Sequence, residues 1–535
     1  MSYSIRKDRG KNQYENLNQD GISFYSNLRR PSILSFLIVS LCFCFLMLSV
    51  WNLNRSLPNK ERHVFFLNPR QSLLQTTSEN FLSFGLDSSL LRNMKEFPIA
   101  NEYFIKLARH LSPAYVRFGG TSADCLYFNQ TSYNYDRQTT NEFDNDISNF
   151  TITDEDFVLL YNFALKAKLR MLFDFNVLLR NSNGTWNNSN ARKILNFALT
   201  NGMNIDWQLG NEPNSFRHVF NVDIPAQQLA KDYLNLRSLL NETGYDDSIL
   251  IGPEANHIGD TEHKTQNGDK YVKEFLENDE NSVNFLSWHQ YYLNGREAKV
   301  ADFLNPEIFN ILPNQIKSIQ EVINSVKRNI SMWLSETGSA FGGGAPDMSN
   351  RFVAGFLFLD KLGYSASVGL QVIIRQSFFG GNYAMVGPDR QPNPDWWIGV
   401  LYKDFVSNKV LKLQSANNFG TLRLYAHCTA GKSLINKMPA VTIYGMNLNN
   451  YPVKILIQGF AASSKSSTFL YTLTADDLQS RTIKMNGEEL KLSSNGDLPA
   501  FNPVFLKTGD FITLPAHSMA FIVMHGVKMS ACSKK

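Results

Sequence analysis

The stretch of this sequence that decides the fold is Ile205-Asp-Trp-Gln-Leu-Gly-Asn-Glu-Pro-Asn214. Here a short apolar run ends in turn-forming residues around Glu212, and Trp333-Leu-Ser-Glu336 repeats that pattern further along the chain. An apolar run that stops at a carboxylate is typical of a buried strand that delivers its last side chain to the rim of a β/α barrel. One such glutamate could equally be an ion-paired structural group, but two of them point to sugar hydrolysis.

The rest of the chain offers eight β-like runs separated by helical stretches, which is the number that a (β/α)8 barrel requires. We expect these strands at residues 81–87, 114–118, 169–175, 205–209, 248–251, 283–289, 331–335 and 368–375. On this count Glu212 ends the fourth strand and Glu336 the seventh, so both side chains face the C-terminal mouth of the barrel. The sequence therefore predicts a catalytic TIM barrel over residues 81–408.

From about Val410 the sequence changes from helical spacing to short alternating runs. Examples are Thr421-Leu-Arg-Leu-Tyr425 and Phe511-Ile-Thr-Leu514, and Asn, Gly and Pro separate them. This pattern predicts a β-sandwich domain of about eight strands over residues 409–535. Residues 64–74, within a stalk expected at 52–80, could add a further strand to it. The predicted fold class is α/β, a barrel followed by a sandwich.

Residues 33–51 form a nearly unbroken apolar run close to the length that spans a bilayer as a helix. The run is longer than a typical signal-peptide core and no clear small-x-small site follows it, so a type II signal anchor is favoured over a removed peptide. Cations before the run favour a cytoplasmic tail at 1–31 and an anchor at 32–51. The remainder is then luminal or extracellular. Cleavage is the alternative, and it would give a secreted or lysosomal protein.

Glycosylation sequons agree with a luminal or extracellular chain. They lie at Asn54, Asn129, Asn149, Asn183, Asn187, Asn241 and Asn329. We interpret the cluster between Asn129 and Asn187 as a glycosylated surface, because these sequons fall in polar stretches.

The five cysteines predict one disulfide and one free thiol. Two of them lie in the membrane run, which leaves Cys125, Cys428 and Cys532 in an oxidising compartment. We pair Cys428 with Cys532 because both belong to the C-terminal region, where a disulfide would restrain the end of the chain. The alternative is that all three stay reduced and buried.

Composition and charge exclude several function classes. The hydrophobic fraction of 43% is ordinary for a globular protein, and a net charge of +4 on a chain of 535 residues indicates no nucleic-acid partner. There is no Gly motif that would cradle a phosphate and no convincing His/Cys metal spacing. We therefore expect neither a cofactor nor a metal, and the sequence carries no indication of the oligomeric state.

With these residues in view, the chain resembles the animal heparanase family, retaining endo-β-glucuronidases that cut heparan sulfate. The similarity covers about residues 64–535. The longest matching stretches are Leu111-Ser-Pro-Ala-Tyr-Val-Arg-Phe-Gly-Gly-Thr121, Gln208-Leu-Gly-Asn-Glu-Pro-Asn-Ser-Phe216, Trp288-His-Gln-Tyr-Tyr-Leu-Asn-Gly-Arg296, Phe341-Gly-Gly-Gly-Ala-Pro346 and Arg375-Gln-Ser-Phe-Phe-Gly-Gly-Asn-Tyr383.

The resemblance implies that Glu212 is the proton donor and Glu336 the nucleophile. Retaining hydrolysis requires two carboxyl groups about 5 to 5.5 Å apart. Glu212 must be protonated near neutral pH or below, a state that apolar surroundings and a neighbouring anion would favour. Asn211 would bind the sugar 2-hydroxyl and Tyr291 would hold Glu336 in line. Alternatively, Asn211 is a turn former and Tyr291 only fills the barrel mouth.

The resemblance also implies which residues bind the substrate. The backbone amides of Gly342, Gly343 and Gly381, together with Tyr383, would receive the glucuronide carboxylate, since glycine lets the backbone approach an anion closely. Residues 342–344 could instead form a plain turn. The remaining matches are Asp87 and Thr121 as cleft-lining residues, His289 as a support of the catalytic pair, and Arg296 as a sulfate-side group or a solvated cation.

Two departures from the family pattern affect the expected substrate. The loop at 125–153 is shorter than in vertebrate heparanases, whose longer insert is excised, so we expect a single chain that is active without excision. Cations near the cleft are sparse and include Arg137, Arg217 and His218. Because sulfate-rich polymers bind through cationic clusters, three substrate hypotheses stay open. They are cleavage of heparan sulfate, exo- or endo-cleavage of less sulfated glucuronides, and heparan sulfate binding without turnover.

Overall fold

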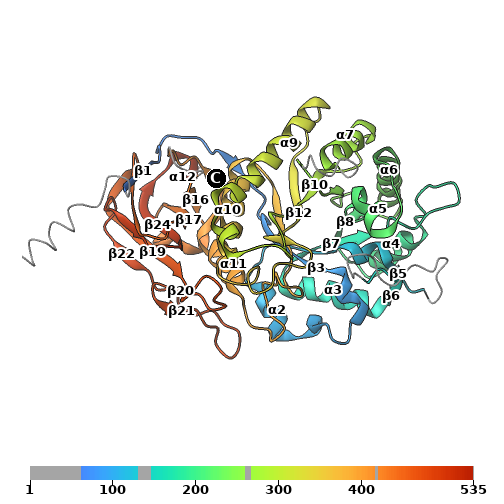
Figure 1. Ribbon diagram of the computed structural model, residues 1–535, viewed down its shortest axis with the longest axis horizontal. Coiled ribbons are helices and arrows are strands. Elements are labelled where there is room, and N and C mark those ends of the chain that lie inside the picture. The colour runs from blue at the N-terminus through green and yellow to red at the C-terminus, as the bar shows by residue number, and fades with distance from the viewer. Residues whose placement is uncertain (1–61, 131–145, 260–266, 416–419, 534–535) are drawn as a thin grey trace, which may run out of the picture. The chain divides into compact units, whose positions relative to one another are not determined.

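The computed structural model describes residues 62–130, 146–259, 267–415 and 420–533, and the chain from Glu61 to Lys535 forms one compact unit (Figure 1). The expected cytoplasmic tail, the expected anchor and the sequon at Asn54 lie outside the described residues. Within those ranges, no helix has both the length and the apolar character that a membrane crossing requires.

Eight parallel strands form the barrel, in the order β8-β7-β4-β3-β14-β12-β10-β9. A parallel bridge between Trp207 and Leu250 joins the two ends of this order and closes it. The strands are β3 (Leu82–Asp87), β4 (Tyr115–Gly119), β7 (Arg170–Phe175), β8 (Ile205–Leu209), β9 (Ile251–Ala255), β10 (Phe285–Gln290), β12 (Met332–Thr337) and β14 (Val372–Arg375). The predicted barrel, with a carboxylate at the ends of its fourth and seventh strands, is confirmed.

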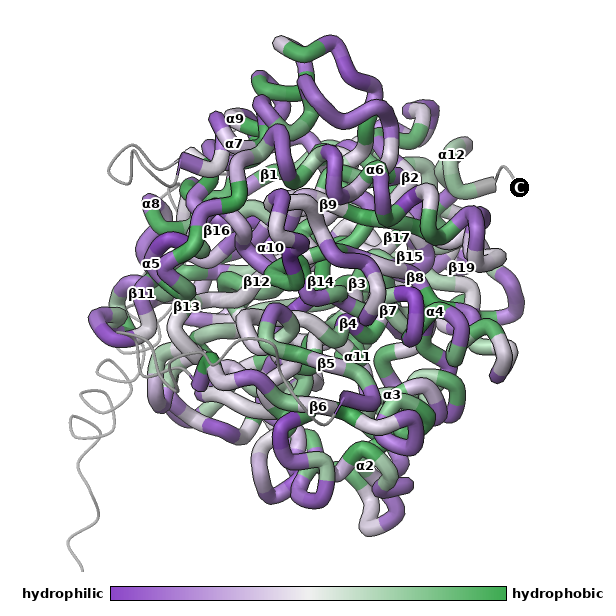
Figure 2. The backbone as a smooth tube through the Cα atoms, turned by 90° about the vertical axis from the view of Figure 1, so that its right-hand side faces the viewer, coloured by the Kyte–Doolittle hydropathy of each residue, from purple (hydrophilic) through white to green (hydrophobic). Residues whose placement is uncertain are grey.

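Helices surround the barrel strands, which lie near the centre of the view in Figure 2. The main ones are α2 (Glu102–Arg109), α3 (Asp154–Ala167), α4 (Ser189–Thr200), α6 (Ala226–Glu242), α7 (Gly268–Asn278), α9 (Ile311–Ser325), α10 (Ala354–Ser367) and α11 (Pro394–Phe405). Local sequence accounts for their ends: α3 begins with a reciprocal capping box between Thr153 and Asp156. All five residues of β8 are buried, as expected for a strand with a packed barrel interior on one side and helices on the other.

The fifth strand differs from its prediction. It was expected at 248–251, because the Gly252-Pro253 pair that follows resembles the end of a strand. Instead, β9 covers Ile251–Ala255. Proline is tolerated there because β9 pairs in register only with β10, where the register shifts beside Trp288. The extra residue at this bulge is Glu254, whose φ is +61°.

Two sheets form the C-terminal domain. The larger follows the order β2-β15-β16-β17-β24-β19-β20-β21, with β22 also paired to β19, and the smaller is β1-β18-β23. The larger sheet contains β2 (Gln75–Thr76), β15 (Val406–Leu411), β16 (Leu422–Thr429), β17 (Ala440–Asn447), β19 (Ala461–Thr474), β20 (Lys484–Met485), β21 (Glu488–Glu489), β22 (Val504–Leu506) and β24 (Ser518–Lys528). The smaller contains β1 (Arg62–Phe66), β18 (Val453–Gln458) and β23 (Ile512–Leu514).

The chain before the barrel contributes to both sheets. β1 pairs in parallel with β18, and β2 pairs antiparallel with β15. The strand expected within residues 64–74 is therefore observed as β1, which overlaps the start of that segment, and β2 begins just after the segment ends. Since α11 ends at Phe405 and β15 begins at Val406, barrel and sandwich follow one another without a linker.

The larger sheet is covered on both faces. One face and the smaller sheet enclose an apolar core that includes Phe65, Leu424 and Ile522. Helices α10 and α11 pack on the other face, where a Cβ added to Gly363 would lie 2.0 Å from the ring of Tyr425. This close approach requires glycine in α10 and fixes the barrel against the sandwich.

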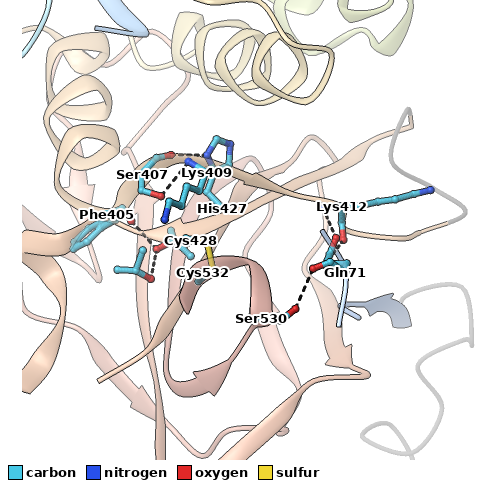
Figure 3. Close-up of a disulfide and its surroundings, with 11 residues drawn as sticks. Gln71, Phe405, Ser407, Lys409, Lys412, His427, Cys428, Ser530 and Cys532 are labelled. Atoms are coloured by element: carbon cyan, nitrogen blue, oxygen red, sulfur yellow. Dashed lines mark hydrogen bonds between the residues drawn. A yellow bond between two sulfur atoms is a disulfide. The ribbon is translucent and has the colours of Figure 1, made fainter. Parts of the chain in front are cut away.

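The predicted disulfide is present between Cys428 on β16 and Cys532 in α12 (Ser530–Ser533), with a Cα–Cα distance of 5.6 Å (Figure 3). Beside it, the Ser530 hydroxyl donates to the Gln71 carbonyl at 3.3 Å. The disulfide and this contact attach the last described residues to the sandwich. Cys125 lies outside the disulfide, and its buried thiol donates to the Ile147 carbonyl at 3.3 Å.

The described sequons lie at the protein surface or close to it. Asn129, Asn183, Asn241 and Asn329 are exposed, and Asn149 and Asn187 are half-buried. This exposure is compatible with glycosylation, which stays a prediction.

Candidate active site

Glu212 and Glu336 meet at the mouth of the barrel. Glu212 lies in the turn after β8 with a φ of +57°, and Glu336 is the second-to-last residue of β12. One carboxylate oxygen of each lies within 4.8 Å of the other. Carboxyl groups of retaining glycosidases stand about 5 to 5.5 Å apart and those of inverting enzymes about 6.5 to 9.5 Å. The pair therefore has the spacing of a retaining site.

Both oxygens of Glu336 are held by donors. The Tyr291 hydroxyl donates to Oε1 at 2.7 Å, and Nη1 of Arg117 donates to Oε2 at 2.8 Å. A carboxylate that accepts a strong hydrogen bond at each oxygen is fixed in orientation. Glu336 is thus held in one orientation by two donors, and Tyr291 contacts it as predicted.

Asn211 is held by Arg117 and Asp124. Nη2 of Arg117 donates to Oδ1 of Asn211 at 2.8 Å, and the Asn211 backbone N–H donates to Asp124 at 2.9 Å. Because Oδ1 is engaged, the Nδ2 amino group is the end of the amide that can donate to a ligand. Asn211 is thus held in one orientation beside Glu212 and Glu336.

His289 connects Glu212 to a third buried carboxylate, Glu254. Its Nδ1 lies 2.8 Å from Oε1 of Glu212, and its Nε2 lies 2.9 Å from Oε2 of Glu254. Burial alone would lower the pKa of His289, but the charge of Glu336 and the hydrogen bonds to Glu212 and Glu254 raise it to about 10. The imidazole is therefore protonated at neutral pH and donates from both nitrogens.

The pKa of Glu212 moves in the direction opposite to the expectation from sequence. Burial raises it, but the hydrogen bond and charge of His289, together with the charges of His257 and Arg117, outweigh burial and lower it. In the unliganded protein the shared proton therefore belongs to His289. Glu212 is the more exposed partner, with 24% of its side chain accessible, whereas the side chains of His289 and Glu254 are fully buried.

Asp87 and Tyr383 lie on the side of the mouth formed by β3 and β14. Gln376 donates to Oδ2 of Asp87 at 3.0 Å. The pKa of Asp87 is raised, first by burial and further by the charge of Glu336. A Cβ on Gly120 would lie 2.7 Å from Asp87, and Thr121 follows directly as the first residue of a 3-10 helix (Thr121–Cys125). Asp87 and Thr121 are thus neighbours on one wall of the mouth.

Two glycine loops meet at Tyr383. Gly342, Gly343 and Gly344 have φ values of +70°, +84° and +87°. The Asn382 N–H donates to the Gly343 carbonyl at 2.7 Å, and a Cβ on Gly381 would lie 2.8 Å from the Tyr383 ring. By contrast, open space surrounds the Cβ positions of Gly342 and Gly343. A ligand can therefore approach their backbone closely.

Arg296 stands apart from the buried cluster. Its side chain is exposed, and its backbone N–H donates to the Asn294 side chain. The preceding residue, Gly295, donates to the Phe341 carbonyl at 3.1 Å, next to the first glycine loop. Arg296 is thus an exposed cation beside the first glycine loop.

A family model described as glycosyl hydrolase family 79, N-terminal domain, matches residues 86–363. The chain belongs to glycosyl hydrolase family 79. The family 79 chain is 33% identical to heparanase from Bos taurus over 500 residues, which cover 86% of this chain and 91% of that protein. It is 29% identical to a hyaluronoglucuronidase from Hirudo nipponia, over 87% of this chain and 98% of that protein. The resemblance to the heparanase family is confirmed.

Solved structures share the fold of this family 79 chain. A 4-O-α-L-rhamnosyl-β-D-glucuronidase from Fusarium oxysporum 12S superposes with a TM-score of 0.62 at 16% identity, over 86% of this chain and 99% of the other. At that identity the match concerns the fold alone: a barrel joined to a β-sheet domain.

Sequence reasoning assigned no role to Arg117, Gln208 and Glu254, which connect the family 79 site. Arg117 contacts Glu336 and Asn211, and it also donates to Gln208 at 3.0 Å and to Glu254 at 3.2 Å. One signal was available, because Arg117 is a charged residue inside the apolar run 114–118. Glu254 was missed because it follows the Gly252-Pro253 pair, before which the fifth strand was expected to end.

A metal ion would compete for the same atoms. Glu212, His289 and Glu336 each present one ligand atom within 4.8 Å of the others. However, the pKa of His289 is raised to about 10, and a protonated imidazole has no lone pair for a metal. These donors fit a proton-sharing cluster better than a metal centre.

Proposed function

We propose that this family 79 chain is a retaining endo-β-glucuronidase that cleaves heparan sulfate. The observation that carries the proposal is the pair of carboxylates, with oxygens within 4.8 Å of each other at the barrel mouth. An oriented Glu336 and an adjacent proton-bearing couple, Glu212 and His289, supply the nucleophile and the acid that this reaction needs.

The reaction takes two displacements. Glu212, which is ionised in the unliganded protein, first takes up a proton from solvent. Glu336 then attacks the anomeric carbon, the glycosidic C–O bond breaks, and Glu212 gives that proton to the departing oxygen. A water molecule then attacks the glycosyl-enzyme, gives its proton to Glu212 and releases Glu336. Asn211 stabilises both transition states through the sugar 2-hydroxyl, a contact that strengthens as positive charge develops on the ring.

Recognition of the uronic acid falls to the glycine loops. The open backbone at Gly342 and Gly343, together with Gly381 and Tyr383, supplies donors for the sugar carboxylate. Asp87 and Thr121 line the wall of the same cleft, and Arg296 receives a sulfate further along the polymer. Tyr383 is half-buried, and burial together with the charges of Asp87 and Glu336 raises its pKa, so its hydroxyl keeps its proton and can donate to an anion.

A less sulfated glucuronide is the second candidate substrate. Of the cations expected near the cleft, Arg137 lies outside the described residues, and Arg217 is paired with Asp223 at 3.1 Å. The similarity to a hyaluronoglucuronidase also favours this candidate. Sulfate groups bind through clusters of unpaired cations. On this second hypothesis, the affinity of the protein for its polymer should depend little on the degree of sulfation.

The test is incubation of the purified, glycosylated protein with heparan sulfate, its unsulfated backbone polymer and hyaluronan from mildly acidic to neutral pH. Heparan sulfate is expected to shorten progressively to mid-sized fragments, the pattern of endo cleavage. Preferential cleavage of either unsulfated polymer would select the second candidate. Release of single sugars would indicate exo action, and binding without shortening would indicate a receptor.

A covalent trap tests the mechanism separately. A 2-fluoro-glucuronide with a good leaving group should glycosylate Glu336, and the modified peptide should be found by mass spectrometry. Inactivation with the label on any other carboxylate would overturn the assignment of the nucleophile.

We also propose that the protein is a single-pass type II membrane glycoprotein with a luminal or extracellular catalytic domain, and that it acts as one chain. Glycosidase treatment should increase its gel mobility, and carbonate extraction should leave it in the membrane fraction. Release into the soluble fraction would favour the secreted or lysosomal alternative. A two-chain active form would contradict activity without excision.

A further inference from the structure

Glu254 is attached to Glu212 twice. Its backbone carbonyl accepts from the Glu212 N–H at 3.1 Å, and its carboxylate reaches Oε1 of Glu212 through His289. The side chain is fully buried at the end of β9, and its φ of +61° at a bulge turns it toward the barrel axis. A non-glycine residue whose backbone is held in the left-handed region while its side chain is buried is most often found at a functional site. The position of Glu254 therefore points to a role in the site.

Its surroundings are arranged for a charged carboxylate. Oε2 accepts from His289 at 2.9 Å, from Arg117 at 3.2 Å and from Gln208 at 3.3 Å, whereas the buried Oε1 has no hydrogen-bond donor. Burial raises the pKa of Glu254, but the hydrogen bond from His289 and the charge of Arg117 outweigh burial and lower it. Glu254 is therefore ionised and supplies a fixed negative charge behind the imidazole ring.

We propose that Glu254 is a positioning residue for the acid–base Glu212 and acts through His289, which it holds in place and in the doubly protonated form. This inference rests on the proposed glycosidase function and deepens it. Glu254 does not touch the substrate, because His289 lies between it and Glu212.

The imidazolium determines how readily Glu212 releases its proton. When Glu212 protonates the leaving oxygen it becomes a carboxylate, and the Nδ1–H of His289 stabilises that charge at 2.8 Å. A neutral His289 would remove this stabilisation and make Glu212 a weaker acid. The charge on Glu254 therefore sets the pH range over which Glu212 can serve first as acid and then as base.

Several other charged or titratable groups face this cluster, and they must stay unchanged in the test. They are Glu336 on β12, Arg117 on β4, Asp174 on β7, His257 after β9 and Tyr291 after β10. Substituting Glu254 by glutamine changes only its charge and preserves the shape and the acceptor for Nε2. The variant Glu254→Gln is therefore the sharpest probe.

The direct measurement is the 15N NMR spectrum of the histidine-labelled protein between pH 5 and 9. Comparison with His289→Gln assigns the His289 signals among the nine histidines of the chain. In the parent, both nitrogens of His289 should stay protonated up to at least pH 8. In Glu254→Gln the ring should lose its proton at a pH lower by about one to three units. A neutral His289 in the parent, or the same titration in both proteins, would overturn the inference whether or not the protein is active.

Activity supplies the second measurement. In Glu254→Gln the bell-shaped pH profile of kcat/KM should move upward by about one unit, because a weaker acid keeps its proton to higher pH. A purely structural role would lower activity without moving the profile, and that result would also overturn the inference. The exposed Glu280 provides the matched control: Glu280→Gln should leave both the spectrum and the profile unchanged.

The two measurements separate failure of this inference from failure of the proposed function. If the parent cleaves none of the polymers while His289 responds to Glu254→Gln as described, the proposed function is wrong and the electrostatic link stands. Asp at position 254 gives a second variant if Gln impairs folding. Glu254→Asp keeps the charge, so the profile should stay near that of the parent.

Discussion

A histidine is buried at the barrel mouth and another in the sandwich, and the pKa values of these two are shifted in opposite directions. His289 at the mouth has its pKa raised to about 10, whereas His427 on β16 has its pKa lowered to about 4. Burial lowers both, so the difference comes from the neighbours. His289 lies between carboxylates, whereas His427 contacts the Ser407 carbonyl at 2.7 Å and the Tyr444 hydroxyl at 3.1 Å.

This contrast separates a region arranged for chemistry from one arranged for stability. At the mouth, Glu212, Glu254 and Glu336 share Arg117 and His289 as partners, and no donor in the described part of the chain reaches the buried Oε1 of Glu254. Between α10 and the larger sheet, Asp360 accepts from Arg423 at 3.2 Å and from Tyr425 at 2.6 Å, so both of its oxygens are paired. Strongly perturbed and incompletely paired groups cluster at functional sites because catalysis needs charges that can change.

The largest expected effect is a loss of activity at the barrel mouth with the stability of the sandwich unchanged. Glu336→Ala should reduce turnover on the order of 10⁴-fold, since the variant has no nucleophile to form the glycosyl-enzyme. Arg117 keeps Glu254 as a partner, so the fold should survive. Product sizing and thermal unfolding, measured on the same preparation, check both statements. Full activity in this variant would remove Glu336 from the mechanism.

The reverse result is expected at the C-terminus. Cys428→Ser should lower the free energy of unfolding by about 2 to 4 kcal/mol, because the cross-link closes a loop of 104 residues in the unfolded chain. Turnover should stay near the parent value, since the disulfide lies in the sandwich. Denaturant unfolding measures the loss, and Cys125→Ser is the control because it leaves the disulfide intact. A variant as stable as the parent would contradict the prediction.

Acid should weaken the sandwich through His427. Its pKa is about 4 in the folded protein and 6.5 in an unfolded chain, so the unfolded state binds the proton more tightly. The stability that His427 contributes is present above pH 6.5 and is lost as the pH falls toward 4, by about 3 kcal/mol in all.

Unfolding free energies at pH 7 and pH 4.5 check this, and His427→Gln should flatten the dependence. His289 acts in the opposite sense. Because its folded pKa is about 10, its contribution is full below pH 6.5 and is lost as the pH rises toward 10. An unfolding profile of His427→Gln identical to that of the parent would refute the assignment to His427.

The smallest expected effect is a partial loss of turnover at the barrel mouth. Tyr291→Phe removes one of the two hydrogen bonds to Glu336 and leaves the one from Arg117. A hydrogen bond to a charged group contributes about 1.5 to 3 kcal/mol, so kcat should fall by about 10- to 100-fold while the fold is kept. Steady-state kinetics measure it. An unchanged kcat would mean that Tyr291 only fills the mouth.

Much of this architecture was readable in the chain. Local sequence patterns predict the barrel strands, the two glutamates and the Cys428–Cys532 pair. Strand periodicity, turn residues and cysteine positions can all be recognised within short stretches of sequence. The fifth strand was misplaced because Gly252-Pro253 looks like a terminator. That error concealed Glu254, the residue that connects Glu212 to the interior of the barrel.

The sequence by itself determined the barrel, the sandwich that follows it and the two glutamates at the ends of the barrel's fourth and seventh strands. Only the tertiary structure decided their spacing, the engagement of Arg117 with both Glu336 and Glu254, and the direction of the Glu212 pKa. The physical reason is that a pKa depends on every charge within several ångströms. For Glu212 those charges come from strands β4 and β10 and the turn after β9, which are distant in sequence and meet only when the barrel closes.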